Sequence, residues 1–138
     1  MVSLTGEVMA VHPNEALLRK GYEAFAKADL DTIQGLFADD VVWHIPGKSP
    51  IAGTYKGRDE VLGFLGEVIS RSEGTFSLDL HDVLASDDHA VALTRSSAQR
   101  QGRTLDVPGT ATYHVRDGKV AEAWIFSGDQ SAEDEFWS

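Results

Sequence analysis

The spacing of apolar residues in this chain changes near Gly74, and this change constrains the fold more than any other feature. Before Gly74 apolar side chains recur every three or four positions, which predicts amphipathic helices. The pattern predicts a first helix that opens at Pro13, a short second one after Asp29 that runs to about Phe37, and a third over about 58–71.

After Gly74 apolar and polar residues alternate, and the chain reads as four strands as far as about Ser127. Turn sequences separate them at 86–88, 101–103 and Asp117-Gly118, the last of which is a strong hairpin signal. Helices followed by an antiparallel meander predict an α+β fold with the helices on one face of the sheet. The long strand over 90–100 has one set of small side chains, which predicts a cavity under the helices. Its other set includes Val91 and Leu93 and suits a dimer contact.

The segment 36–61 joins these two halves and concentrates reactive side chains. Asp39-Asp40 breaks the helical run, and the β-branched and aromatic residues 41–45 then predict a strand that stops at Pro46-Gly47. A long loop follows up to Arg58. Strand parity puts either the Val42/His44 set or the 41/43/45 set inside, and the sequence leaves this choice open.

Length and composition bound the class of protein. The chain has 138 residues, which predicts one domain over 13–138 preceded by a flexible arm over 1–12. It has no cysteine, which excludes disulfides and cysteine-bound zinc and fits a cytoplasmic location. A net charge of −10 argues against nucleic acid and against an anionic membrane as partners. We read no signal peptide and no membrane span in the sequence.

Three segments carry a family resemblance: AFAKADLDTIQGLFADDVVWHIPG, YKGRDEV and YHVRDGKVAEAW. Together with the order of elements they resemble the SnoaL-like proteins of the nuclear-transport-factor-2-like superfamily, over about 13–137. The resemblance implies a cystatin-like α+β cone, in which three N-terminal helices pack on a strongly curved, mainly antiparallel sheet that encloses a pocket. It does not fix an activity, because ketosteroid isomerases, polyketide cyclases, scytalone dehydratases, limonene epoxide hydrolases and binding or assembly modules share this fold.

The catalytic positions of two such relatives can be compared residue by residue. By alignment the tyrosine and the two aspartates of ketosteroid isomerases fall at Gly21, Ile45 and Ala111, or Thr110 if the gap moves, so all three catalytic groups are absent. The second aspartate of the epoxide hydrolases falls at Phe126, and no Arg-x-Asp pair occurs on the long strand. Their water-binding asparagine corresponds to His44. Neither mechanism is therefore expected in its known form.

His44 is the first candidate for chemistry, because a histidine beside a carboxylate exchanges protons near neutral pH. Asp129, at the end of the last strand, is the proposed carboxylate partner, and Tyr22 and Tyr113 are proposed to donate hydrogen bonds to a substrate oxygen. The alternative is that His44 lies at a dimer face or strand edge and that Asp129 is a solvated turn residue.

Aromatic side chains are expected to wall the pocket of such a protein. The proposed substrate-binding residues are Phe25, Trp43, Phe64, Trp124 and Phe126. The histidines and aspartates near 81–89 resemble ordinary turn chemistry more than a metal site, so no metal and no cofactor is expected.

Two functions from different classes remain. One is a small cofactor-independent enzyme that performs cyclase, isomerase or dehydratase chemistry on a hydrophobic carbonyl-containing or polycyclic compound. The other is a module of the same fold that binds a hydrophobic small molecule, or assembles, without reacting. An outward-facing His44 favours the second. The expected partners are the small molecule and a second copy of the chain, paired through the outer sheet face.

Overall fold

A computed structural model describes residues 11–138, so most of the predicted N-terminal arm lies outside the described part of the chain. The helices are α1 (Pro13–Ala26), α2 (Leu30–Leu36), α3 (Arg58–Arg71) and α4 (Gln130–Trp137). The strands are β1 (Phe37–Ile45), β2 (Gly53–Lys56), β3 (Ser77–Ala85), β4 (His89–Arg100), β5 (Arg103–Arg116) and β6 (Lys119–Ser127). No helix among the described residues is both long and apolar enough to cross a bilayer.

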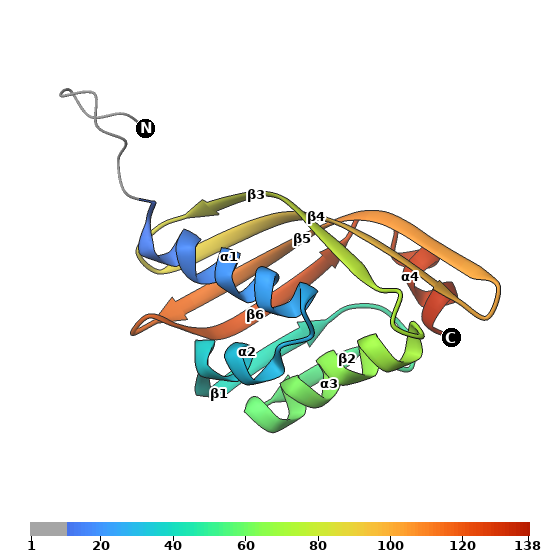
Figure 1. The fold of residues 1–138 in the computed structure, drawn as a ribbon, viewed down its shortest axis with the longest axis horizontal. Coiled ribbons are helices and arrows are strands. Elements are labelled where there is room, and N and C mark those ends of the chain that lie inside the picture. The colour runs from blue at the N-terminus through green and yellow to red at the C-terminus, as the bar shows by residue number, and fades with distance from the viewer. Residues whose placement is uncertain (1–10) are drawn as a thin grey trace.

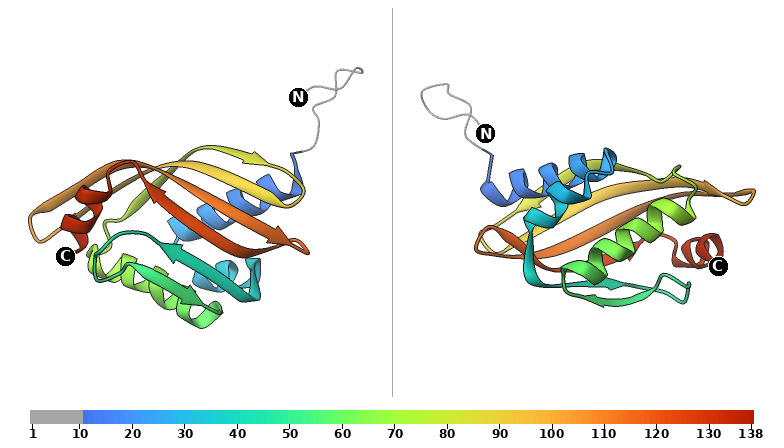
Figure 2. Two further views of the ribbon diagram at one scale, coloured as in Figure 1. Left: turned by 180° about the vertical axis from the view of Figure 1, so that it is seen from behind. Right: turned by 60° about the horizontal axis from the view of Figure 1, so that its bottom comes forward.

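The six strands form one curved sheet in the order β2-β1-β6-β5-β4-β3. Only the β1–β6 pair among them is parallel. Helices α1, α2 and α3 cover the concave face, and α4 lies at the end of the sheet near the β4–β5 hairpin (Figures 1 and 2). The α+β class and the helix-covered, curved sheet are therefore confirmed.

The boundaries show where local sequence signals decide the structure. Helix α3 spans the predicted residues 58–71, and β6 matches the prediction. At the β5–β6 hairpin Asp117 and Gly118 both have positive φ, 53° and 74°, which suits the twist of a two-residue turn. Helix α1 begins at Pro13. The preceding residue, His12, caps it, because its side chain accepts a hydrogen bond from the Asn14 N–H at 3.0 Å.

Two expectations about the elements were wrong, and one element was not expected. Asp39 and Asp40 do not precede β1 but lie within it, because a register shift between Phe37 and Val42 leaves their side chains exposed, where they pair with Arg58 and Arg116. The predicted long loop contains β2, which pairs antiparallel with β1. A fourth helix, α4, which was not among the expected elements, forms from the acidic C-terminal segment, whose Phe136 and Trp137 are buried.

The inner face of the sheet is composed of small and aromatic side chains. Ala92 and Ala123 are fully buried at its centre, and Trp43 and Tyr113 are 8% and 5% exposed. They meet Leu18 of α1, Ile33 of α2 and the α3 row that includes Phe64. The small residues of β4 thus face the helices, as the alternation along this strand predicted.

Candidate functional site

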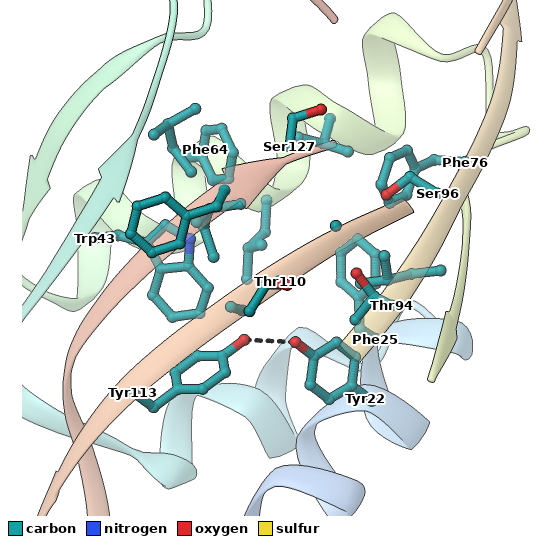
Figure 3. Close-up of a pocket in the computed structure, with 18 of the residues that line it drawn as sticks. Tyr22, Phe25, Trp43, Phe64, Phe76, Thr94, Ser96, Thr110, Tyr113 and Ser127 are labelled. Atoms are coloured by element: carbon teal, nitrogen blue, oxygen red, sulfur yellow. Dashed lines mark hydrogen bonds between the residues drawn. The ribbon is translucent and has the colours of Figure 1, made fainter. Parts of the chain in front are cut away.

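A cavity of about 180 Å³ lies between the inner face of the sheet and the helices. Its walls come from α1, α2, α3, α4 and the inner residues of β1, β4, β5 and β6. Figure 3 shows the aromatic rings of Phe25, Trp43, Phe64 and Phe76 around it, together with the hydroxyl groups of Tyr22, Thr94, Ser96, Tyr113 and Ser127. The lining is mostly apolar, which is typical of a small-molecule site.

The cavity exists because β4 presents short side chains to α1. Thr94 and Ser96 line it, and they continue the inner row that begins with Ala90 and Ala92. Side chains of this size leave space that the helices do not fill, since the backbone of α1 already packs on β3 and β4. Besides the hydroxyls of these short side chains, two ionisable groups interrupt the apolar lining, one on the α1 side and one on α4.

The polar group on the α1 side is a pair of tyrosines. The hydroxyls of Tyr22 and Tyr113 lie 2.7 Å apart in a hydrogen bond, drawn dashed in Figure 3. Burial raises the pKa of Tyr22 to about 12 and holds the pKa of Tyr113 well above its ordinary value. Because each hydroxyl has two acceptor lone pairs and one proton, the pair satisfies itself and still has one proton to donate to a ligand oxygen.

The polar group on α4 is Glu133, which the sequence did not suggest as a site residue. Among the described residues that line the cavity it is the one with a carboxyl group, and none of them is Lys, Arg or His. Burial raises the pKa of Glu133, the nearby Asp134 charge adds to this, and a hydrogen bond with Trp137 opposes it. The signal that could have found it is Asp129, a good helix cap, followed by a segment that ends in Phe136-Trp137. In such a helix Glu133 lies three and four residues before these aromatic residues and therefore shares their inward face.

His44 does not reach this cavity. The register puts Trp43 and Ile45 inside, so the His44 side chain lies on the outer face of the sheet. There its Nε2 lies 2.6 Å from a carboxylate oxygen of Glu122, and its ring stacks on Trp124 at a centroid distance of 5.5 Å. The Thr54 hydroxyl lies 3.4 Å from its Nδ1. His44 thus bonds to Glu122 on the outer face of the sheet, outside the cavity, which agrees with the alternative that its ring merely finds partners away from the pocket.

Asp129 is not the partner of His44. Its side chain caps α4 and accepts a hydrogen bond from the Ala132 N–H at 3.1 Å. It does not line the cavity either. The predicted His44–Asp129 pair is therefore not formed, because strand parity turns His44 outward and the helix cap uses the aspartate.

The other predicted site residues divide between the two faces. Tyr22, Tyr113, Phe25, Trp43 and Phe64 all line the cavity. Phe126 lies at its rim and is 53% exposed. Trp124 lies outside, with His44, because it is directly opposite Thr112 on the outer side of β5. No three His, Asp or Glu side chains of residues 11–138 gather as a metal site would require.

The fold and cavity define the class as a small α+β protein whose cone-shaped sheet encloses a ligand-sized apolar pocket. The SnoaL-like domain family matches residues 18–123, and the chain belongs to this family. It is 34% identical over 123 residues to the uncharacterized protein Rv0034 of Mycobacterium tuberculosis, covering 88% of this chain and 94% of that one.

Solved structures give the same result. Bal32a, from a soil-derived mobile gene cassette, is 36% identical with a TM-score of 0.89, covering 91% of this chain and 97% of its own. A protein of unknown function with a cystatin-like fold from Xanthomonas campestris is 32% identical with a TM-score of 0.86, covering 93% and 99%. The family and its superfamily include polyketide cyclases and ketosteroid isomerases, and these relatives assign none of those activities to this chain.

Proposed function

We propose that the protein binds a neutral, mainly apolar small molecule in the cavity, with a carbonyl or hydroxyl oxygen held by the Tyr22–Tyr113 pair. The observation that carries this proposal is a buried hydroxyl pair in an otherwise apolar cavity. A buried donor without a water or ligand partner is costly, so a ligand oxygen at this point gains a hydrogen bond that water provides poorly in an apolar cavity.

The size and charge of the cavity narrow the ligand. An apolar cavity of about 150 Å³ takes one benzene ring, and this one is about 180 Å³. One ring or two fused rings therefore fit better than a larger polycycle. Anionic ligands are disfavoured, because the described lining includes no Lys, Arg or His and does include Glu133.

Titration calorimetry with 2-naphthol tests this proposal. We expect binding to the native protein and a loss of binding in Thr94→Phe, because the larger ring fills the cavity. Leu93→Phe is the matched control, since Leu93 is the neighbouring residue of the same strand and lies on the outer face. Equal affinity of the two variants for 2-naphthol would show that the compound binds elsewhere.

A second candidate function is proton-transfer chemistry of the isomerase or cyclase type. It is favoured by Glu133, a carboxyl group of raised pKa in the cavity wall, which can exchange a proton with a carbonyl compound bound beside it. Exchange of the α-protons of 2-tetralone in D₂O, followed by NMR, separates the two functions. If the native protein and Glu133→Gln exchange these protons at the same rate, the proton-transfer function is excluded and only the binding function remains.

We also propose that the protein forms a homodimer through the outer face of the sheet. Val91, Leu93 and Trp124 are only partly covered there, and Leu84 and Phe126 are 58% and 53% exposed. Apolar side chains gathered on one sheet face are typical of an interface. Light scattering should give a mass near twice 15.0 kDa for the native chain and near 15.0 kDa for Val91→Asp. A native mass of 15.0 kDa would exclude the dimer.

A further inference from the structure

The ionisable side chains that line the cavity are the Tyr22–Tyr113 pair and Glu133, and they come from different ends of the sheet. Tyr113 lies near the end of β5, where its hydroxyl meets Tyr22 of α1. Glu133 lies on α4, which starts where the Gly128 N–H donates to the Pro108 carbonyl at 2.8 Å. Pro108 and Tyr113 are five residues apart on one strand, so their Cα atoms are separated by about 17 Å at roughly 3.4 Å per residue.

We infer that Glu133 is a second binding point, and that the ligand carries two oxygen functions at opposite ends of an apolar ring system. This inference rests on the proposed binding function and names its ligand class. One oxygen is held by the tyrosine pair and the other by the Glu133 carboxyl group. The rest of the wall is mainly apolar, with Trp43 of β1 and Phe64 of α3 among its residues, and it also carries the hydroxyls of Thr94 and Ser96.

The surroundings of Glu133 support a binding role over a solvent-exposed one. Its side chain lines the cavity and is half-buried, while Glu135 of the same helix is exposed. Partial burial raises the pKa of Glu133, so its carboxyl group takes up a proton more readily than an exposed one and can then donate as well as accept. Trp137 provides one hydrogen bond to this carboxyl group, and the group has further acceptor sites for a ligand.

The helix that carries Glu133 is held in place at both ends. Asp129 caps its first turn, and the guanidinium groups of Arg100 and Arg103 donate to carbonyls at its last turn, including that of Phe136 at 3.1 Å and that of Glu135 at 2.8 Å. The Asp134 carboxylate accepts a hydrogen bond from the Lys48 N–H at 3.0 Å, which ties the helix to the loop after β1. A fixed helix keeps the Glu133 carboxyl group at a defined distance from the tyrosines. Such a distance is needed to distinguish ligands by the separation of their two oxygens.

Calorimetric titration with three compounds tests this inference. They are 2-naphthol with one oxygen, 2,6-dihydroxynaphthalene with oxygens at opposite ends, and 2,3-dihydroxynaphthalene with adjacent oxygens. We expect the 2,6 compound to bind the native protein about tenfold more tightly than 2-naphthol, as one added buried hydrogen bond allows. The 2,3 compound should show no such gain, because it cannot reach both ends.

In Glu133→Leu the gain should disappear, so that the 2,6 compound binds no more tightly than 2-naphthol does. Glu133→Gln should keep most of the gain, and Glu135→Gln should keep all of it, as the matched control on the exposed side of the helix. Glu133→Ala gives the same comparison if leucine disturbs the packing of α4. A gain that persists in both apolar variants, or none in the native protein, overturns the inference. If 2-naphthol itself fails to bind, the proposed binding function fails as well.

Discussion

The two faces of the central sheet are made from alternate residues of the same strands, and they differ completely in chemistry. The inner face carries buried alanines, Trp43 and Tyr113, and apart from Tyr113 its residues that line the cavity do not ionise. The outer face carries His44 with Glu122, the stacked pair His89 and His114, and the Arg95–Asp106 ion pair.

This difference follows from the two-residue period of a strand. Neighbouring residues point to opposite faces, so a shift of one position exchanges the whole inner set for the outer one. Trp43 and His44 are adjacent in the sequence, yet one walls the cavity and the other pairs with a carboxylate outside it. The face on which a side chain lies, more than its chemical type, decides its part in ligand binding.

The largest effect should come from removing a tryptophan from each face in turn. Trp43→Ala should lower the free energy of unfolding by about 3–5 kcal/mol, because it leaves a void beside Phe37 and Tyr113. Trp124→Ala, its outer-face control, should cost about 1 kcal/mol, since its ring stacks on half-exposed His44. Urea denaturation at several protein concentrations measures both. Equal losses would contradict the assignment of inner and outer faces.

The tyrosine pair should make stability depend on alkaline pH. In the unfolded chain Tyr22 loses its proton near its ordinary pKa of 10, whereas the folded protein holds it until about pH 12. The folded state therefore binds more protons in this range, and the stabilisation is complete below pH 10 and is lost as the pH rises towards 12. The expected loss from Tyr22 is about 2–3 kcal/mol.

Urea denaturation between pH 9 and 11, compared with the double variant Tyr22→Phe/Tyr113→Phe, isolates this contribution. The double variant should lose less stability over the same range, because it lacks the two buried tyrosine hydroxyls. Tyr55 and the lysines titrate in both proteins, so their contribution cancels in the comparison. Parallel curves for the two proteins would show that the pair is not buried as the structure has it.

A smaller effect should come from breaking the hydroxyl pair. Tyr22→Phe removes one hydroxyl and leaves that of Tyr113 buried without its partner, which should cost about 1–2 kcal/mol. Tyr113→Phe should behave likewise. The double variant should cost less than the sum, because no orphaned hydroxyl remains, and a double-mutant cycle in urea measures the coupling. Strict additivity would mean that water already satisfies each hydroxyl.

Much of this arrangement could be predicted from local sequence signals. The apolar period predicted α1 and α3, the turn residues predicted β4 to β6, and the small row of β4 predicted a cavity. Five of the nine proposed site residues line the cavity, and Phe126 is at its rim. These features depend on neighbours in the chain or on a strand's own alternation, both of which a single sequence shows.

The remaining features depend on pairing between distant segments. The face of His44 follows from how β1 aligns with β2 and β6, with Trp43 opposite Tyr55 on one strand and Ala123 on the other. Strand β2 pairs with the edge that β1 offers, and Arg100 and Arg103 fix where the end of α4 lies on the body. Glu133 was missed for this reason, since its place in the cavity exists only after that helix docks.

The smallest effects should come from the outer ion pair, and they are the sharpest test of the two-face picture. His44→Gln and Glu122→Gln each remove one partner of a pair whose side chains are about one-third exposed. Each should change the free energy of unfolding by less than about 1 kcal/mol, because exposed ion pairs are screened by water. Neither variant should change the affinity for 2-naphthol in calorimetry, in contrast to Thr94→Phe. A large loss of ligand affinity in His44→Gln would return His44 to the binding site and would require the opposite register for β1.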